Sequence, residues 1–287
     1  MSLLVNETGP LLLVQDLGRA GSMHLGVPPS GALDRTALAL ANRLVGNPER
    51  AAGLEILVGG VRLRAQTSLR IALTGAVMGL RIGGRSASWG LGESVRSGEE
   101  VEVRSTDEGL RAWLAISGGV LAQPALGSRS TDTLTGLGPA AVEPGDVLEL
   151  GSWSETQVGP GMAVPEPVPA VWTLPLVLGP RDDWFTTEAC EGLFAQEYTV
   201  SPKSNRTALR LQGQGPLARR ESGELASEGI VTGAVQVPTS GQPLVFLADH
   251  PVTGGYPVIG VIETAALAAC AQARPGDRLR FQRSRGR

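Results

Sequence analysis

Cysteine is scarce in this sequence. The 287 residues contain only two, Cys190 and Cys270. Two thiols cannot build a disulfide framework, and alone they cannot complete a zinc site. So few thiols are typical of proteins that work in a reducing compartment. We therefore expect a cytoplasmic protein.

Long hydrophobic runs and basic clusters are also missing. No run approaches the roughly 18 apolar residues that span a bilayer, and the opening MSLLVNETGP has neither the basic nor the apolar part of an export signal. The net charge is -3, and no stretch combines Lys and Arg with aromatic residues. We expect neither a membrane nor a nucleic-acid partner.

Common cofactor motifs do not occur. The sequence has no Walker A loop, no G-x-G-x-x-G between a strand and a helix, no HExxH and no Cys–His set with ligand spacing. It predicts no metal site of its own. Lys203 is the only lysine, and its SPKSN surroundings do not resemble the Met-Lys-Met of a biotin carrier. Any biotin would have to be carried by another protein.

Glycine and proline, in contrast, are abundant. There are 39 Gly and 20 Pro beside 42% hydrophobic residues, and the apolar runs are short and closely interrupted. This pattern predicts a mainly β chain with a few helices. The expected strands are residues 11–15, 54–58, 69–74, 101–104, 113–116, 147–150, 174–178, 231–237, 244–248, 258–262 and 278–281.

Two helices are expected between these strands. In residues 34–45, apolar residues recur at i, i+3, i+4 and i+7 and so share one face, with Asp34 as N-cap and Gly46 closing the helix. The second helix covers residues 264–273 and stops at Pro275. Because it consists almost entirely of apolar or small residues, we expect it to be buried.

A weak internal repeat predicts two units. PGDVLEL (144–150) and PGDRLRF (275–281) place the same turn before a strand, and we expect each strand to close its own barrel. Residues 154–170, rich in Pro, Gly and small residues, are predicted to form a linker. The expected domains are residues 1–160 and 161–287.

Polar residues stand among glycines in VQDLGRAGSMHLGVPPSGALD, residues 14–34. Glycines let a backbone approach a ligand, and the segment Ser30-Gly31, which leads into the helix, presents free N–H groups to an anion. Arg19 and Asp34 belong to the same stretch. The alternative is structural: Asp34 only caps the helix, and Arg19 forms a surface ion pair. The same stretch also contains Gln15, Asp16 and His24.

A second polar cluster is GSRSTDT, residues 127–133, which contains Arg129 and Ser130. The planar fork of an arginine meets two oxygens of a carboxylate or phosphate at once. The segment therefore predicts an oxyanion contact. The alternative is a polar turn with a solvated arginine.

The second half of the chain offers a strand glutamine and a strand-end acid. Gln236 lies between two valines, so its side chain points away from theirs, either into water or into a pocket. Asp249 directly follows the apolar run LVFLA, at a strand end where a rigid scaffold commonly displays functional groups. The glycines that follow are expected to bring Thr253 and Tyr256 beside it.

Taken in order, these motifs resemble the biotin-dependent carboxyltransferase family, whose members are also called allophanate hydrolase subunit 2, KipA-like, or the 5-oxoprolinase subunit designated C. VQDLGRAGSMHLGVPPSGALD, LGSRST, GPRDDWF, SEGIVTGAVQVP and TGGYPVI carry the resemblance, which runs from about Gly9 to Phe281. It implies two cyclophilin-like β-barrel subdomains, the first similar to carboxyltransferase subdomain A and the second to subdomain B.

The resemblance also implies a reaction and partners. Standalone members are similar to a 5-oxoprolinase subunit that works with a smaller companion and a third lactam-opening protein. The companion resembles allophanate hydrolase subunit 1 or the 5-oxoprolinase subunit designated B. Together they open 5-oxoproline to glutamate with ATP and Mg.

Two alternatives to this reaction stay open. One is a urea-carboxylase-type carboxyltransferase or allophanate hydrolase subunit 2 that uses biotin carried elsewhere. The other is a KipA-like regulator that binds a kinase-inhibitor partner.

The expected site draws on both halves of the chain, and we expect its residues to meet in one cavity. The residues expected to be catalytic are Asp249, Gln236 and Tyr256. Those expected to bind the small-molecule substrate or a phosphate are Arg19, Ser30, Gly31, Asp34, Arg129, Ser130, Arg206, Thr253 and Gly254.

The chain departs from the family pattern at two places. Asn205 stands where most members have an Asp, which removes a charge expected to pair with Arg206. His250 and Pro251 stand where most members have a basic or polar pair. His250 is either a catalytic group that titrates near neutral pH or a structural histidine.

Overall fold

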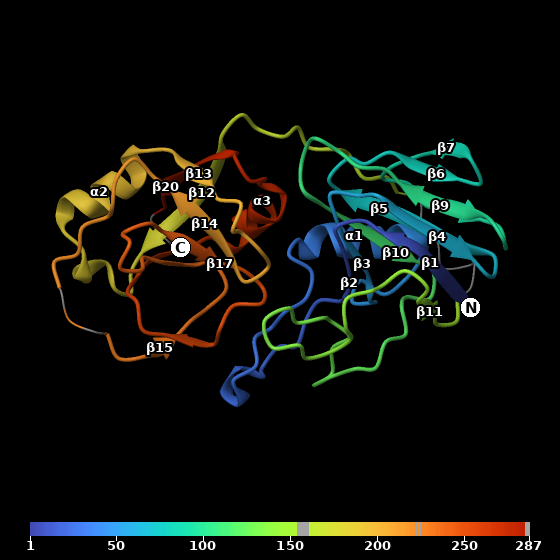
Figure 1. The fold of residues 1–287 in the computed structure, drawn as a ribbon, viewed down its shortest axis with the longest axis horizontal. Coiled ribbons are helices and arrows are strands. Elements are labelled where there is room, and N and C mark those ends of the chain that lie inside the picture. The colour runs from blue at the N-terminus through green and yellow to red at the C-terminus, as the bar shows by residue number, and fades with distance from the viewer. Residues whose placement is uncertain (154–160, 222, 224, 285–287) are drawn as a thin grey trace. The chain divides into compact units, whose positions relative to one another are not determined.

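The structure is a computed structural model that describes residues 1–153, 161–221, 223 and 225–284 (Figure 1). The chain divides into two compact units. The first comprises Met1–Ala20 and Ser30–Val168, and the second comprises Gly21–Pro29 and Pro169–Arg287. The predicted boundary at residue 160 and the linker residues 154–160 lie outside the described residues.

The first unit is built from two antiparallel sheets. The six-stranded sheet has the order β11-β1-β4-β9-β6-β7, with β11 Val147–Glu149, β1 Ser2–Thr8, β4 Val61–Ala65, β9 Glu100–Val103, β6 Leu80–Ile82 and β7 Arg85–Ala87. The five-stranded sheet has the order β2-β3-β10-β5-β8, with β2 Leu11–Gln15, β3 Gly53–Leu57, β10 Arg111–Ile116, β5 Leu69–Gly75 and β8 Glu93–Val95.

Apolar side chains from both sheets form one buried cluster that is the core of this unit. Strand β4 shows the pattern: in VRLRA the two arginines are exposed and the other residues are buried, because successive side chains point to opposite faces. An isolated bridge between Val120 and Leu150 joins the chain beyond β10 to the chain beyond β11. The two sheets therefore enclose a barrel-like core.

Helix α1, Arg35–Val45, lies against β5 and β10 (Figure 1). Small side chains at Ala72 and Ala115 on these strands face the helix and let it pack closely. The side chain of Asp34 accepts a hydrogen bond from the backbone N–H of Ala37 at 2.9 Å, and Gly46, at φ 79°, ends the helix. The predicted helix and both of its ends are confirmed.

The second unit is a closed seven-stranded barrel. Its strands follow the order β12-β19-β16-β17-β14-β13-β20, with β12 Trp172–Leu178, β19 Val258–Ile262, β16 Ala234–Gln236, β17 Leu244–Phe246, β14 Ala208–Gln212, β13 Tyr198–Val200 and β20 Arg278–Arg283. A short ladder pairs β15, Glu228–Gly229, with β18, Thr253–Gly254. The helices are α2, Thr187–Ala195, and α3, Leu267–Gln272, together with 3₁₀ turns at Met23–Leu25, Asp182–Trp184 and Thr264–Ala266.

The two PGD turns lead to different results. Strand β20, after the second turn, pairs in parallel with β12 and antiparallel with β13, so it closes the barrel as expected. Strand β11, after the first turn, pairs with β1 at the edge of the six-stranded sheet, and at its end only the Val120–Leu150 bridge and neighbouring backbone bonds join it to the chain after β10, so it closes the barrel-like core without a full ladder. The same turn can introduce either arrangement because the partner strands decide the pairing.

The mainly β fold of two barrel-like subdomains is confirmed. Residues 11–15 and 258–262 have the predicted bounds, whereas the strand expected at 231–237 is reduced to β16. The helix expected to be buried at 264–273 starts as a 3₁₀ turn, and within α3 only Cys270 and Ala271 are buried. Among the described residues, no helix has the length and apolar character needed to cross a membrane.

Candidate functional site

Asp16, the residue after β2, joins residues 15–19 to residues 128–131. These two segments, together with Ser30 and Gly31, are called the first polar cluster below. Its carboxylate accepts hydrogen bonds from the hydroxyls of Ser128 and Ser130, both at 2.6 Å, and from the backbone N–H groups of Arg129 and Gly18, both at 2.7 Å. Two segments more than 100 residues apart in the sequence are thereby joined by one side chain. Asp16 is therefore a scaffold for the neighbouring predicted site residues.

Hydrogen bonding also determines the ionisation of Asp16. Burial by itself raises the pKa of this carboxyl, but the bonds from Ser128, Ser130, Arg129 and Gly18 outweigh burial and hold its pKa below the ordinary value. The carboxylate is charged at neutral pH, and its charge is satisfied by the segment that it organises.

Arg19 lies inside this cluster and is 2% exposed. Its Nε donates to the backbone carbonyl of Ala125 at 3.3 Å, and its Nη2 donates to the carbonyl of Ser130. Its Nη1 has no hydrogen-bond partner, and within the described part of the chain no carboxylate lies within ion-pair distance of it. The alternative of a surface ion pair for Arg19 is therefore wrong, because the guanidinium is buried against carbonyls.

Ser30 and Gly31 line the same region. Both have a positive φ, 50° and 88°, and a Cβ on Gly31 would lie 2.7 Å from the backbone nitrogen of Gly18. Only glycine fits there, because no side chain tolerates such an approach to backbone. Ser30 is 6% exposed, and its hydroxyl has no hydrogen-bond partner among the described residues. Ser30 thus has a left-handed backbone conformation and a buried hydroxyl without a hydrogen bond among the described residues.

Asp34 has a structural role in this geometry. Its carboxylate caps α1, and burial raises its pKa although backbone hydrogen bonds from Ala37 and Thr36 act in the opposite direction. Just before it, the backbone N–H of Leu33 donates to Glu55 at 3.3 Å. The carboxylates of Asp34 and Glu55 therefore both hold the backbone at the start of α1 in place.

In the second unit, Asp249 and Arg206 form a buried ion pair. Arg206 Nε lies 2.9 Å from Asp249 Oδ2, and Nη2 lies 3.0 Å from Oδ1; the side chains are 2% and 0% exposed. The Asp missing at position 205 does not leave Arg206 unpaired, because Asp249 supplies the carboxylate. Asn205 instead accepts hydrogen bonds from the N–H groups of Thr207 and Ala208 and shapes the turn before β14.

Gln236 points into the protein. It is 4% exposed, and its Nε2 donates to the backbone carbonyl of Tyr256 at 2.9 Å. A Cβ on Gly254 would lie 2.9 Å from that Nε2 and 2.6 Å from Cδ1 of Ile230. The alternative that Gln236 faces water is therefore wrong, and Gly254 is needed so that the segment passes close to the glutamine.

Tyr256 is the exposed member of this second cluster, at 43%. The guanidinium carbon of Arg219 lies 5.6 Å from the centre of its ring, and Arg219 Nη2 donates to the carbonyl of Val237. Thr253 is exposed on β18, where it pairs with Gly229. The sequence carried no signal for Arg219, because it stands in a loop without a recognisable pattern.

His250 is completely buried beside Asp249. Its Nδ1 lies 2.8 Å from the carbonyl of Pro251, its ring packs against Phe246, and its Nε2 has no hydrogen-bond partner among the described residues. Burial lowers its pKa, although the Pro251 carbonyl and the charge of Asp249 raise it. The imidazole is therefore neutral near pH 7, with Nδ1 donating.

The predicted site residues thus form two sets. The set in the first unit is Arg19, Ser30, Gly31, Asp34, Arg129 and Ser130, and the set in the second unit is Arg206, Gln236, Asp249, Thr253, Gly254 and Tyr256. Asp16 and Ser128 hold the first set together. A single shared cavity for both sets stays a prediction.

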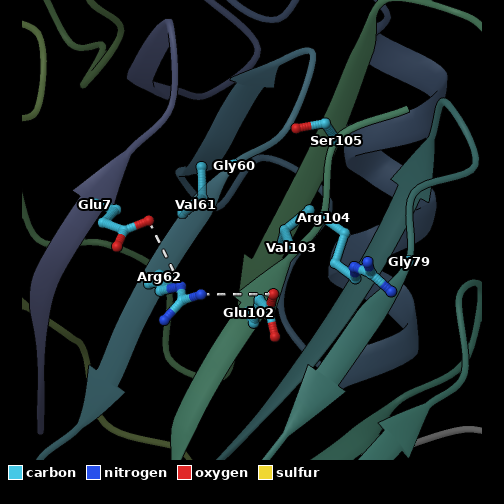
Figure 2. Close-up of a pocket in the computed structure, with 9 residues that line it drawn as sticks. All are labelled: Glu7, Gly60, Val61, Arg62, Gly79, Glu102, Val103, Arg104 and Ser105. Atoms are coloured by element: carbon cyan, nitrogen blue, oxygen red, sulfur yellow. Dashed lines mark ion pairs between the residues drawn. The ribbon is translucent and has the colours of Figure 1, made fainter. Parts of the chain in front are cut away.

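Two hollows lie on the surface of the described residues, and none of these site residues lines either of them. A groove of about 490 Å³ lies over β1, β4 and β9, where Arg62 stands 3.5 Å from Glu7 and 3.8 Å from Glu102 (Figure 2). A second hollow of about 430 Å³ lies along α2. Arg62 pairs with Glu7 and Glu102 in this groove at solvent-accessible positions, as on an ordinary solvated sheet face.

Residues 25–283 match the carboxyltransferase domain, subdomain A and B. The chain belongs to this carboxyltransferase family. The predicted resemblance is therefore confirmed over nearly the whole chain, including both sets of polar residues except those before residue 25.

Curated relatives in the family fall into two groups. The chain is 34% identical to the 5-oxoprolinase subunit designated C of Escherichia coli (strain K12), over 97% of this chain and 90% of that protein. It is 32% identical to urea amidolyase of Lachancea kluyveri, over 96% of this chain but only 16% of that protein.

Two solved structures contain this fold within longer chains. The structure of TTHA0988 superimposes with a TM-score of 0.88 at 37% identity, covering 98% of this chain and 55% of that one. The structure of the K. lactis urea amidolyase gives a TM-score of 0.92 at 29% identity, covering 98% of this chain and 18% of that one. The fold thus corresponds to about half of one solved chain and to a small part of a much longer enzyme.

Proposed function

We propose that this chain is one subunit of an ATP-dependent 5-oxoprolinase, which opens the lactam ring of 5-oxoproline to give glutamate. One observation carries the proposal: the chain accounts for 90% and 87% of the length of two relatives named as a 5-oxoprolinase subunit, at 34% and 31% identity. Urea amidolyases match it over only 16% of their length. The proposed setting is the cytoplasm.

Partners are part of the proposal. A protein named as a subunit works in a complex, and we propose a smaller companion similar to the 5-oxoprolinase subunit designated B, together with a third lactam-opening protein. The small-molecule substrate would be bound by the complex rather than by this chain alone.

The chemistry requires activation of a poor electrophile. In the complex, ATP supplies a phosphoryl group that converts the amide oxygen into a leaving group. In the part of the chain that the structure describes, no group of three or more His, Cys, Asp or Glu side chains is placed to hold a metal ion. Mg²⁺ on ATP normally takes only one or two carboxylates beside the phosphates, so we propose ATP and Mg for the complex and assign no residue of this chain to them.

The residues of this chain would bind and position the substrate. In the first unit, Arg19, Ser30 and Arg129 would contact an oxyanion. Ser130 would support them from the loop that Asp16 holds, because its hydroxyl and N–H already donate to Asp16 and Ser128. Negative charge that develops on oxygen is best stabilised by donors that are already fixed in place.

In the second unit, the exposed Thr253 and Tyr256 would contact the amide ring, while Gln236 fixes the backbone of Tyr256. The bidentate contact of Asp249 with Arg206 makes Asp249 a positioning residue that orients a cation, rather than a base with a free carboxylate.

A urea-carboxylase-type carboxyltransferase is the second candidate. The TM-score of 0.92 to the K. lactis urea amidolyase favours it, because nearly the whole of this chain corresponds to one part of that enzyme. Such a reaction would need biotin carried by another protein.

The deciding experiment reconstitutes the chain with its companion and the third protein and follows ADP release with 5-oxoproline. A parallel reaction contains urea and carboxybiotin. ADP release that depends on 5-oxoproline supports the first candidate. Turnover with urea and carboxybiotin alone contradicts it and supports the second.

Tyr256→Phe tests the site within that assay. The chain has two tyrosines, and Tyr198, which is 1% exposed, provides the matched control Tyr198→Phe. Loss of one substrate hydrogen bond is expected to lower kcat/KM about tenfold in Tyr256→Phe. Equal activity of the two variants would remove Tyr256 from the site.

A further inference from the structure

Unpartnered buried polar atoms are concentrated in the first polar cluster. Ten buried side-chain nitrogen and oxygen atoms of the described residues have no hydrogen-bond partner, and five of them come from this cluster. These five atoms are Gln15 Oε1, Arg19 Nη1, Ser30 Oγ, Arg129 Nε and Thr131 Oγ1. Buried polar atoms are nearly always paired, so such a concentration indicates groups that await an external partner.

Three segments that meet at one place supply these atoms. Gln15 Nε2 donates to the carbonyl of Thr131 at 2.9 Å, and Arg19 Nη2 donates to the carbonyl of Ser130. Gly31, next to Ser30, lies against Gly18. These contacts tie the segments around residues 15–19, 30–31 and 128–131 into one cluster within the first unit.

The charge of the cluster calls for an anion. The described residues place no carboxylate within ion-pair distance of Arg19 or Arg129, and Asp16 directs its oxygens to hydroxyl and backbone N–H groups. Carbonyl oxygens accept the hydrogen bonds of Arg19 but carry no full charge. A buried cation without a counter-ion is costly, and an incoming oxyanion would remove that cost.

The donors suit a small anion with a single charge. Arg19 Nη1 offers its two N–H groups, and Ser30 and Thr131 offer their hydroxyls. The side chain of Arg129 is half-buried, so the cluster reaches solvent on that side. A nucleotide phosphate chain brings several charges, more than the few unpartnered donors of this cluster can match.

We propose that this cluster binds the carboxylate of a small amide substrate and so selects amides that carry a carboxylate over neutral ones. The proposal rests on the proposed function, because it identifies the anion as the carboxylate of the lactam substrate. Within the family it separates a chain that takes 5-oxoproline from one that takes urea, which has no carboxylate.

The test compares two ligands that differ only in the carboxylate, 5-oxoproline and 2-pyrrolidinone. Binding of each to the full chain in complex with its companion is measured by titration calorimetry, without ATP. 5-Oxoproline is expected to bind at least about tenfold more tightly, the ratio that one charge-assisted hydrogen bond produces. Equal affinity for the two ligands would overturn the proposal.

Two variants locate the selectivity. Arg19→Gln is expected to abolish the tenfold preference, and Ser30→Ala, which only removes a hydroxyl, to reduce it. Arg43→Gln, on the exposed face of α1, is the matched control and is expected to leave the preference unchanged. If Arg19→Gln fails to fold, the ligand comparison and Ser30→Ala still decide. An undiminished preference in both site variants would contradict the assignment.

Competition identifies the anion. Acetate is expected to displace 5-oxoproline at lower concentration than inorganic phosphate does, and the reverse order would overturn the carboxylate assignment. Selective binding without any 5-oxoproline-dependent ADP release would leave the carboxylate site standing while contradicting the proposed function. The two failures are therefore distinguishable.

Discussion

Two arginines, one in each unit, are equally buried but differently held. Arg19 and Arg206 are each 2% exposed. Arg206 meets the carboxylate of Asp249 at 2.9 and 3.0 Å, whereas Arg19 meets the backbone carbonyls of Ala125 and Ser130. A carboxylate cancels the charge of a guanidinium, and a carbonyl satisfies only its N–H groups. Arg206 therefore stabilises the barrel, and Arg19 remains available to an external anion.

The largest expected effect comes from breaking the internal pair. Asp249→Ala leaves Arg206 buried without its carboxylate and is expected to lower the free energy of unfolding by about 3–5 kcal/mol, measured by urea denaturation. Arg19→Met separates no ion pair and is expected to cost less, about 1–3 kcal/mol. An equal loss in the two variants would remove the distinction between the two arginines.

Two controls accompany this prediction. Replacing both partners, Arg206→Met with Asp249→Leu, is expected to restore much of the lost stability, because no charge is left buried. Arg43→Ala breaks the exposed pair with Glu49 and is expected to cost less than about 1 kcal/mol.

The next effect concerns Asp16. Asp16→Asn replaces an acceptor of four hydrogen bonds by a group that is partly a donor, and a loss of about 2 kcal/mol is expected. The variant should also weaken 5-oxoproline binding, since Asp16 holds the loop that carries Arg129 and Ser130. Unchanged stability and binding would show that the loop does not depend on this carboxylate.

The pH dependence of stability tests the same residue. The pKa of Asp16 in the folded state lies below the ordinary 3.8, so the stability that it contributes is fully present above pH 3.8 and is lost as pH falls through the folded-state pKa. The unfolding midpoint of Asp16→Asn is expected to change less with pH in this acid range than that of the wild type. Parallel curves would contradict this cause.

A comparable effect is expected at Gly254. A Cβ there would meet Ile230 and Gln236 at 2.6 and 2.9 Å, so Gly254→Ala should cost about 1–3 kcal/mol and disturb Tyr256. Gly229→Ala, across the same short ladder, is the matched control because a Cβ at Gly229 would meet nothing within 4 Å. Equal thermal stability of both variants would show that the segment can move aside.

The smallest effect is the titration of His250. Burial lowers its pKa below 6.5, so its contribution to stability is fully present above pH 6.5 and is lost as pH falls through the folded-state pKa. The unfolding midpoint of the wild type should therefore fall slightly from pH 7.5 to pH 5, and less so in His250→Gln. His24→Gln, which removes the exposed histidine, is the control and should follow the wild type.

Local patterns predicted several elements well. The N-cap at Asp34 and the glycine end at Gly46 are properties of a few consecutive residues, and both were predictable. Strand β4 was missed, although VRLRA alternates, because a run of five residues with two arginines resembles a loop. Helix α2 was missed because only Ala189 and Leu193 on it are buried, which leaves no apolar stripe to recognise.

The sequence predicted which residues belong to the candidate site, but not which of them contact one another. The glycine-flanked polar residues were recognisable, yet neither the role of Asp16 as scaffold nor the contact of Gln236 with Tyr256 followed from spacing. Strand alternation allowed the Gln236 side chain to point either into water or into the protein. The packing around β16 buries it.

The sequence by itself determined the family, the β-rich class and the caps and turns, because each depends on residues that are close along the chain. Only the tertiary structure decided which arginine is neutralised. Asp249 lies 43 positions from Arg206, and the carbonyl of Ser130 lies 111 positions from Arg19, so both contacts exist only after the strands have paired. Charge compensation depends on distance in space, which composition and spacing do not encode.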